Sequence, residues 1–132
     1  MLVVDDDPSI RKMIIAALRR GEVSYSFLEA PNGRDALDLM RAEHPDVVVL
    51  DLMMPVLSGW DVLRERADDD ELKAIPVIVV SANRDPEVVT AVNAGICAFL
   101  PKPFDISALS ALVRSCIPPE NALPDPGHQA LQ

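Results

Sequence analysis

The sequence predicts an α/β fold in which one sheet of parallel strands carries helices on both faces. Short apolar, β-branched runs recur along the chain, and segments with helical spacing of apolar residues alternate with them. Pro and Gly residues lie near the expected helix starts and ends. A regular alternation of strand and helix implies right-handed crossovers, which cover both faces of the sheet. We therefore expect a doubly wound, five-stranded parallel sheet.

Five short runs rich in Val, Ile and Leu have the length of strands. They comprise residues 2–4, 25–30, 47–50, 75–80 and 96–100. The third and fourth runs are almost entirely apolar, which is typical of strands that are buried on both faces.

Five further segments carry apolar residues at helical spacing. They are marked by Ile10, Ile14, Ala17 and Leu18; by Ala36, Leu37 and Met40; by Trp60, Leu63 and Ala67; by Val88, Val89 and Val92; and by Ile106, Leu109, Leu112 and Val113. Pro8 and Pro86 suit helix starts, while Gly21 and Gly95 suit helix ends. Asp7, directly before Pro8, is expected to cap the first helix.

We expect one domain over residues 1–117 and a Pro-rich linker or disordered tail over residues 118–132. The chain has 132 residues, of which 49% are apolar, enough for a single buried core. After Ile117 the apolar periodicity stops, and four prolines follow, at positions 118, 119, 124 and 126.

Composition excludes several classes of function. With 21 acidic and 12 basic residues the formal charge is −9, so the domain as a whole repels nucleic acid and anionic membranes. No apolar run approaches the roughly 20 residues that cross a bilayer, and no secretory signal pattern is present. Cys97 and Cys116 lack metal-site spacing, and two cysteines are too few for a disulfide scaffold, so we expect buried, reduced thiols. These features predict a cytoplasmic protein that binds neither nucleic acid nor membrane.

Polar residues that could take part in binding or catalysis follow four of the predicted strands. Each alone would suit a helix cap, a turn or a solvated surface charge. In a doubly wound sheet, however, the carboxyl ends of the strands together form the site. The set that we expect to meet at this edge consists of Asp5 and Asp6 after the first strand, Asp51 after the third, Ser81 after the fourth and Lys102 after the fifth.

Several carboxylates packed together repel one another, and a hard cation relieves that repulsion. Ligands that are all oxygen atoms suit Mg²⁺, with Mn²⁺ as a substitute, and the absence of a nearby His or Cys in the sequence argues against zinc. Such a cation neutralises charge as a phosphoryl group moves to an Asp oxygen, while Lys102 and Ser81 contact the other phosphoryl oxygens. Asp51 is then the nucleophile.

Four ordered motifs make the sequence resemble the receiver domains of two-component response regulators. They are residues 3–11 (VVDDDPSIR), residues 51–55 (DLMMP) with Gly59, Ser81-Ala82, and residues 101–104 (PKPF). The resemblance covers residues 1–117 and implies a flavodoxin-like (βα)5 topology with strand order 2-1-3-4-5.

The resemblance also implies the roles of the acidic residues. Asp51 is the phosphoacceptor. Asp6, Asp51 and the backbone carbonyl of Met53 bind the metal directly, and Asp5 acts on it through water. The side chains of Met53 and Asn83 flank the approach of hydrolytic water and thus tune dephosphorylation.

The resemblance assigns the phosphoryl contacts to Ser81, the Ala82 backbone and Lys102, with a cis peptide between Lys102 and Pro103. Phe99 corresponds to the aromatic switch residue whose rotamer follows the state of Ser81. In the family, Thr is more frequent at the position of Ser81 and Tyr is frequent at the position of Phe99. Ser81 keeps the hydroxyl group, whereas Phe99 lacks the phenolic hydroxyl of Tyr.

By the same resemblance, the phosphoryl donor is a sensor histidine kinase, a phosphotransfer protein or a small phosphodonor. The surface formed by the fourth helix, the fifth strand and the fifth helix is expected to meet an output domain, an effector protein or a second copy of the chain. Its helices carry few ionised residues, so we expect apolar contact there.

Two alternative functions remain open. Asp5-Asp6-Asp7 partly imitates phosphohydrolases of the haloacid dehalogenase type, although Pro8-Ser9 follows and the chain has no room for a cap insertion. A pseudo-receiver would keep the fold as a protein-binding module, although such domains usually lose the acceptor, the acid pair or the lysine. A flavin phosphate is excluded because three aspartates in the first loop would repel it.

Overall fold

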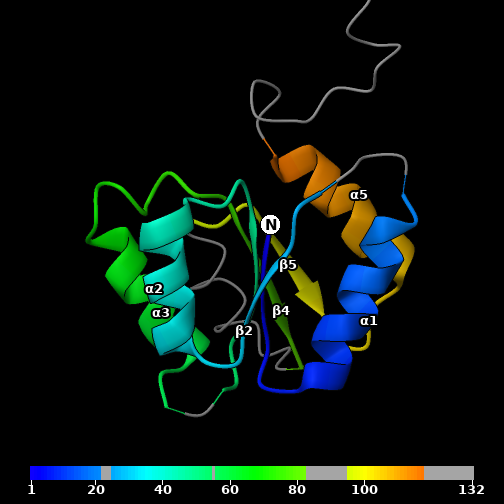
Figure 1. Cartoon of the computed structure of the whole chain (residues 1–132), viewed down its shortest axis with the longest axis horizontal. Helices are drawn as coiled ribbons and strands as arrows, with labels where there is room; N and C mark the ends of the chain where they lie inside the picture. Colours follow the sequence, from blue (N-terminus) through cyan, green and yellow to red (C-terminus); the bar gives the residue numbers. More distant parts are fainter. Residues whose placement is uncertain (22–24, 55, 83–94, 118–132) are drawn as a thin grey trace, which may run out of the picture.

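The structure, a computed structural model, describes residues 1–21, 25–54, 56–82 and 95–117, and in these ranges strands and helices alternate (Figure 1). The strands are β1 (Leu2–Val4), β2 (Leu28–Ala30), β3 (Val48–Asp51), β4 (Val77–Ser81) and β5 (Ala98–Pro101). The helices are α1 (Pro8–Arg19), α2 (Gly33–Glu43), α3 (Gly59–Ala67) and α5 (Ile106–Cys116). The helix predicted around Val88 and the tail predicted over residues 118–132 lie outside the described residues.

All five strands are parallel, in the order β2-β1-β3-β4-β5, which confirms the predicted fold class and topology. The register sets the level at which each strand ends. Val4 pairs with Leu50, so the residues that follow them, Asp5 and Asp51, lie side by side at the carboxyl edge. Ser81 pairs with Pro101 at the same edge, directly before Lys102.

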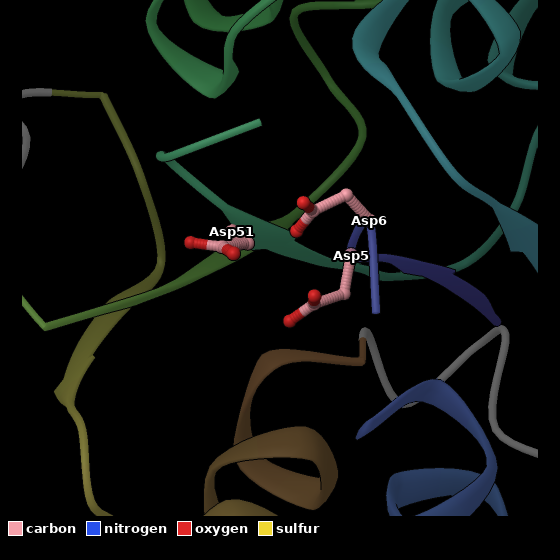
Figure 2. Close-up of side chains that lie close together, drawn as sticks. All are labelled: Asp5, Asp6 and Asp51. Atoms are coloured by element: carbon pink, nitrogen blue, oxygen red, sulfur yellow. The ribbon is translucent and has the colours of Figure 1, made fainter. Parts of the chain in front are cut away.

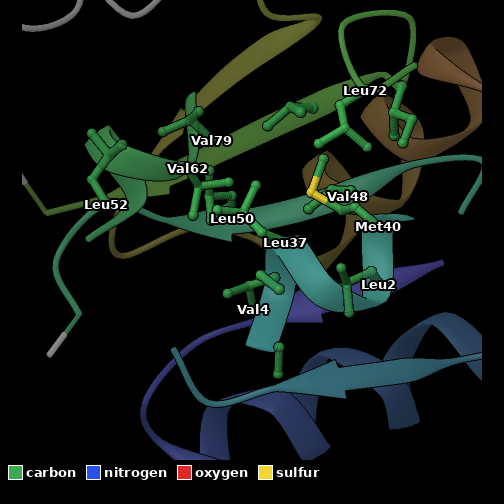
Figure 3. Close-up of a cluster of buried hydrophobic side chains, with 14 residues drawn as sticks. Leu2, Val4, Leu37, Met40, Val48, Leu50, Leu52, Val62, Leu72 and Val79 are labelled. Atoms are coloured by element: carbon green, nitrogen blue, oxygen red, sulfur yellow. The ribbon is translucent and has the colours of Figure 1, made fainter. Parts of the chain in front are cut away.

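Helices cover both faces of the sheet, with α2 and α3 on one face and α1 and α5 on the other (Figure 1). Successive strand residues point to opposite faces, so β1, β3, β4 and β5 each contribute to two cores, whereas β2 contributes Leu28 and Ala30 to the first core only. Leu2, Val4 and Leu50 pack with Leu37 and Met40 of α2 in the first core (Figure 3). The second core joins the alternate strand residues to α1 and α5, with Val3, Val49, Ile14, Leu18, Leu109 and Val113 among its members.

Side chains before the helices supply the caps that the backbone N–H groups need. Asp7 accepts from the N–H of Ser9 at 2.8 Å and Pro8 opens α1, as predicted. Asn32 caps α2, and Ser58 forms a reciprocal capping box with Asp61 at the start of α3.

Several strands begin later than the apolar runs predict. β2 begins at Leu28 rather than at residue 25, and β5 begins at Ala98 rather than at residue 96. Tyr25, Phe27 and Ile96 nevertheless pack against the cores. Burial extends beyond the ladder, which is why apolar runs overestimate strand length.

The expectation of two reduced thiols is wrong, because Cys97 and Cys116 form a disulfide. Cys97 lies directly before β5 and Cys116 is the last residue of α5, and the fold brings their Cα atoms to 6.0 Å. That distance suits a disulfide, although 19 positions separate the residues in the sequence. Cys116 is buried as expected, whereas Cys97 is exposed.

Arg66, on α3, is a buried charge that the sequence analysis did not identify. Its guanidinium donates to the carbonyls of Ile75 (2.8 and 3.0 Å), Lys73 (3.0 Å) and Gly95 (2.9 Å). Burial lowers its pKa from the ordinary value. These bonds compensate for the desolvation and tie α3 to the chain that precedes β4 and β5.

Within the described ranges, none of the helices is long and apolar enough to cross a bilayer.

Candidate functional site

Three carboxylates meet at the carboxyl edge of the sheet. Asp5 and Asp6 follow β1, and Asp51 is the last residue of β3 (Figure 2). One oxygen from each lies within 4.8 Å of the other two. Asp5 and Asp51 are only 4% and 6% exposed, whereas Asp6 is exposed. The predicted acidic site is therefore formed in the folded chain.

Lys102 contacts both buried carboxylates of this cluster. Its Nζ lies 3.3 Å from Oδ2 of Asp5 and 3.4 Å from Oδ2 of Asp51. The Lys102 N–H donates to the carbonyl of Ser81 at 2.8 Å, which links the ends of β4 and β5. The Lys102–Pro103 peptide is cis, as the resemblance implied.

The loop after β3 holds Asp51 in place. The Met53 N–H donates to Oδ1 of Asp51 at 3.1 Å, and the Gly59 N–H donates to the Leu52 carbonyl at 3.0 Å. A Cβ at Gly59 would lie 2.4 Å from the Asp51 carbonyl oxygen and 2.6 Å from the Leu52 Cα. Glycine is therefore required where α3 begins, because any side chain would displace the acceptor strand.

The negative charge of Asp51 is only partly compensated by its surroundings. Burial raises its pKa above the ordinary value; the Met53 amide and Lys102 counteract this, and Asp5 adds to it. Burial alone would lower the pKa of Lys102, but Asp51 and Asp5 outweigh burial, and the pKa is raised. Lys102 thus stays charged, yet one ammonium does not compensate fully for the burial of Asp51.

The donor set fits a hard divalent cation. Carboxylate oxygens are ligands that Mg²⁺ prefers, and Asp6 is exposed, so the cluster is open to water on that side. In the part of the chain that the structure describes, the potential ligand cluster at this edge contains neither His nor Cys.

The loop after β1 is held by residues whose role the sequence analysis missed. The Asp7 N–H donates to Oδ1 of Asp5 at 2.9 Å. Nη1 of Arg11 donates to the Asp5 carbonyl at 2.6 Å, and Nε of Arg11 donates to Oε1 of Glu29 at 3.0 Å. The sequence did contain a signal, because Arg11 is the last residue of the first motif and lies in the helix that follows the acidic loop. Its partner Glu29 on β2 could not be recognised from the sequence.

The remaining predicted residues take different positions. Ser81 is fully buried at the end of β4, and Ala82 follows it on the surface. Phe99 is partly buried on β5 and packs against the core that α2 and α3 cover. Met53 is 64% exposed beside the acceptor. Asn83 lies outside the described residues, so its predicted role in dephosphorylation stays a prediction.

A family model described as the response regulator receiver domain matches residues 1–114. The chain belongs to this receiver family. The match covers every element of the sheet and all of the site residues named above. Receiver domains are signalling modules and not classical enzymes.

Relatives with recorded names support the same assignment. The receiver is 41% identical over 130 residues to the response regulator MprA of Mycolicibacterium vanbaalenii, covering 96% of this chain and 53% of that protein. It is 35% identical over 118 residues to the probable transcriptional regulator ycf27 of Porphyridium aerugineum, covering 89% of this chain and 47% of that protein. The chain therefore spans about half the length of these relatives.

Solved structures of other receivers share the fold. The receiver domain of the Francisella response regulator 1452 superposes with a TM-score of 0.79 at 31% identity, covering 88% of this chain and 93% of that one. The chemotaxis response regulator CheY4 of Vibrio cholerae superposes with a TM-score of 0.77 at 28% identity, covering 87% and 95%.

Proposed function

We propose that this receiver accepts a phosphoryl group on Asp51 in a Mg²⁺-dependent reaction, with a histidine kinase or phosphotransfer protein as the donor. The observation that carries the proposal is the contact of Lys102 with both Asp5 and Asp51, within a cluster of carboxylates. Lys102 and Asp51 are 51 residues apart in the sequence, and the fold brings their side chains together at the carboxyl edge of the sheet, where Asp6 is exposed.

In the proposed reaction a carboxylate oxygen of Asp51 attacks phosphorus, the P–N bond of a phosphohistidine breaks and the imidazole leaves. Mg²⁺, held by Asp6, Asp51 and the Met53 carbonyl with Asp5 acting through water, would neutralise charge on the transferring group. The Met53 N–H restrains Asp51, so the nucleophile is positioned before the donor arrives.

Lys102 has two tasks in this proposal. Before transfer its ammonium contacts Asp51 and Asp5 and opposes the increase that burial causes in the pKa of the Asp51 nucleophile. After transfer its ammonium would pair with a phosphoryl oxygen. The Ser81 hydroxyl and the Ala82 backbone would contact the other oxygens.

The proposed switch starts at Ser81 and reaches the surface through Phe99. Ser81 is buried and bonded through its carbonyl to Lys102, so a hydroxyl that turns toward the phosphoryl group changes the space beside β5. Phe99, which is only partly buried, would follow by changing rotamer. The surface affected comprises β5, α5 and the predicted helix around Val88, where an output domain, an effector protein or a second copy would bind.

The cellular setting is part of the proposal. Relatives about twice as long include proteins named as transcriptional regulators, which favours an output domain or effector as the target of this receiver. We place the domain in the cytoplasm with its kinase. The argument from reduced thiols no longer supports that location, because the cysteines are paired.

Intact-mass spectrometry after incubation with acetyl phosphate and Mg²⁺ tests the proposal. We expect a mass increase of one phosphoryl group that is absent in Asp51→Asn, in Asp6→Asn and in EDTA. Asp7→Asn is the matched control, because Asp7 is an acid in the same loop whose carboxylate caps α1 and lies outside the metal cluster.

Equal adducts in Asp51→Asn or without metal would overturn the assignment. A domain that takes no phosphoryl group but binds a partner would be a pseudo-receiver. Steady hydrolysis of a phosphomonoester, lost in Asp5→Asn but not in Asp51→Asn, would indicate a phosphohydrolase.

A further inference from the structure

Arg11 connects the acidic loop to β2, and we propose that it is a positioning residue for the metal site. The inference rests on the proposed function, since it concerns the same Mg²⁺ site. It assigns a role to Arg11 and Glu29, neither of which belongs to the carboxylate cluster.

The guanidinium of Arg11 makes two directed contacts. Nη1 donates to the carbonyl oxygen of Asp5 at 2.6 Å, and Nε donates to Oε1 of Glu29 at 3.0 Å. The Arg11 side chain is 14% exposed and that of Glu29 is 41% exposed. Glu29 belongs to β2, so its backbone is held by the sheet and provides a rigid anchor for the guanidinium.

The contacted carbonyl belongs to the peptide bond that joins Asp5 to Asp6. Because that peptide is planar, fixing its oxygen also restricts the direction in which the Asp6 Cα follows. The flanking groups are already held: the Asp5 N–H donates to the Ala30 carbonyl at 3.2 Å, and the Asp7 N–H donates to Asp5 Oδ1 at 2.9 Å. Arg11 completes the set by binding the group between them.

Asp6 depends on this backbone restraint more than its neighbours do. Among the described residues, no hydrogen bond reaches the Asp6 side chain, and it is exposed, whereas Asp5 and Asp51 are buried and contact Lys102. The orientation of Asp6 toward the metal site is therefore set mainly by the backbone of the loop. Loss of the Arg11 contact would leave Asp6 to sample orientations that do not bind metal.

The positive charge of Arg11 and its proposed positioning role predict opposite changes in Mg²⁺ affinity when Arg11 is removed. A fixed cation next to a cation site opposes metal binding, so its removal by charge alone would tighten Mg²⁺ binding. A positioning role predicts weaker binding after the same change. Lysine does not replace arginine in this role, because an ammonium lacks the planar fork that bonds a carbonyl and a carboxylate at once.

The test is calorimetric titration with Mg²⁺ on the wild type, Arg11→Met, Arg11→Lys and the control Lys12→Gln. Methionine keeps the apolar stem and removes the contacts. We expect about a tenfold higher Kd in both Arg11 variants, in the range found when residues supporting metal ligands are lost. Lys12 neighbours Arg11 on α1 with an exposed side chain, and we expect its variant to bind Mg²⁺ with a Kd equal to or slightly below that of the wild type.

A double-mutant cycle with Glu29→Met, which removes the oxygen that accepts from Arg11 Nε, separates positioning from the charge of Glu29. If Glu29 acts by holding Arg11, Glu29→Met weakens Mg²⁺ binding in the wild type and has no further effect in Arg11→Met. Urea unfolding in EDTA, run on every variant, shows that each is folded before titration. Arg11→Lys and Glu29→Met keep the proposal testable if Arg11→Met does not fold.

The outcomes separate this inference from the proposed function. Wild-type protein that does not bind Mg²⁺ overturns the metal site and, with it, the positioning role. Wild-type binding that is equal or tighter in Arg11→Met overturns the positioning role alone, as does full retention of affinity in Arg11→Lys or additive effects in the cycle.

Discussion

Reduction of the disulfide between Cys97 and Cys116 is expected to destabilise the domain by about 3 kcal/mol. The bond closes a segment with a sequence separation of 19. In the chain-entropy model, a loop of about 20 residues loses roughly 11 cal/mol/K in the unfolded state, which corresponds to about 3 kcal/mol at 25 °C. This is a large share of the 5–15 kcal/mol by which small domains are typically stable.

The effect should be measurable because the disulfide joins two elements of the core. It links the residue before β5 to the last residue of α5, and Cys116 packs in the core beneath α1 and α5. Urea denaturation followed by circular dichroism, with and without a dithiol reductant, gives the difference without any change of sequence. Mass spectrometry of alkylated samples verifies the oxidation state before each curve.

The variant Cys97→Ala/Cys116→Ala is the control, since it has no bond to reduce. It should be less stable than the oxidised wild type and should not respond to the reductant. A wild-type loss below about 1 kcal/mol, or an equal response of the control, would refute the reasoning.

Three further predictions concern the site. Burial raises the pKa of Asp51 in the folded state, so ionisation of Asp51 destabilises the folded domain. This destabilisation is absent below the unfolded-state pKa and is complete once the pH has risen through the folded-state pKa. In EDTA, Asp51→Asn should therefore have a higher Tm than the wild type at neutral pH, and a difference in Tm that does not shrink toward about pH 4 would contradict this. Gly59→Ala places a Cβ 2.4 Å from the Asp51 carbonyl oxygen, so we expect the free energy of unfolding in urea to fall by about 1–3 kcal/mol and phosphorylation by acetyl phosphate to be lost. Gly21→Ala, whose Cβ would lie 3.3 Å from its nearest neighbour, should keep both the stability and the phosphorylation of the wild type. Met53→Asn should speed dephosphorylation, because the apolar Met53 side chain would cover the phosphoryl group but could not orient water by hydrogen bonding. Each tenfold increase in rate would correspond to about 1.4 kcal/mol of barrier, and an equal or slower rate with Mg²⁺ and no phosphatase present would show that Met53 does not control water access.

Local sequence patterns were sufficient to predict most of the fold. The period of apolar residues predicted α1, α2, α3 and α5, and Asp7-Pro8 predicted the start of α1. The strands were found as apolar runs; β1 begins where it was predicted, and the other four strands begin one to three residues later than predicted. The positions directly after strands identified Asp5, Asp6 and Asp51, because a parallel sheet places its carboxyl ends on one edge whatever the details of packing.

Only the tertiary structure decided which distant residues meet. Arg11 lies 18 positions from Glu29 and Cys97 lies 19 from Cys116, and no local pattern marks either pair. Lys102 and Asp5, which are 97 positions apart, were expected at one edge of the sheet, but their direct contact at 3.3 Å came from the structure alone. The cysteine prediction failed for this reason: composition describes how many thiols exist, whereas their pairing depends on where β5 starts and α5 ends. Apolar periodicity, Pro and Gly report the local conformation of neighbouring residues. Contacts between distant strands and helices instead depend on the path of the connections between strands, which is fixed only when the whole sheet assembles.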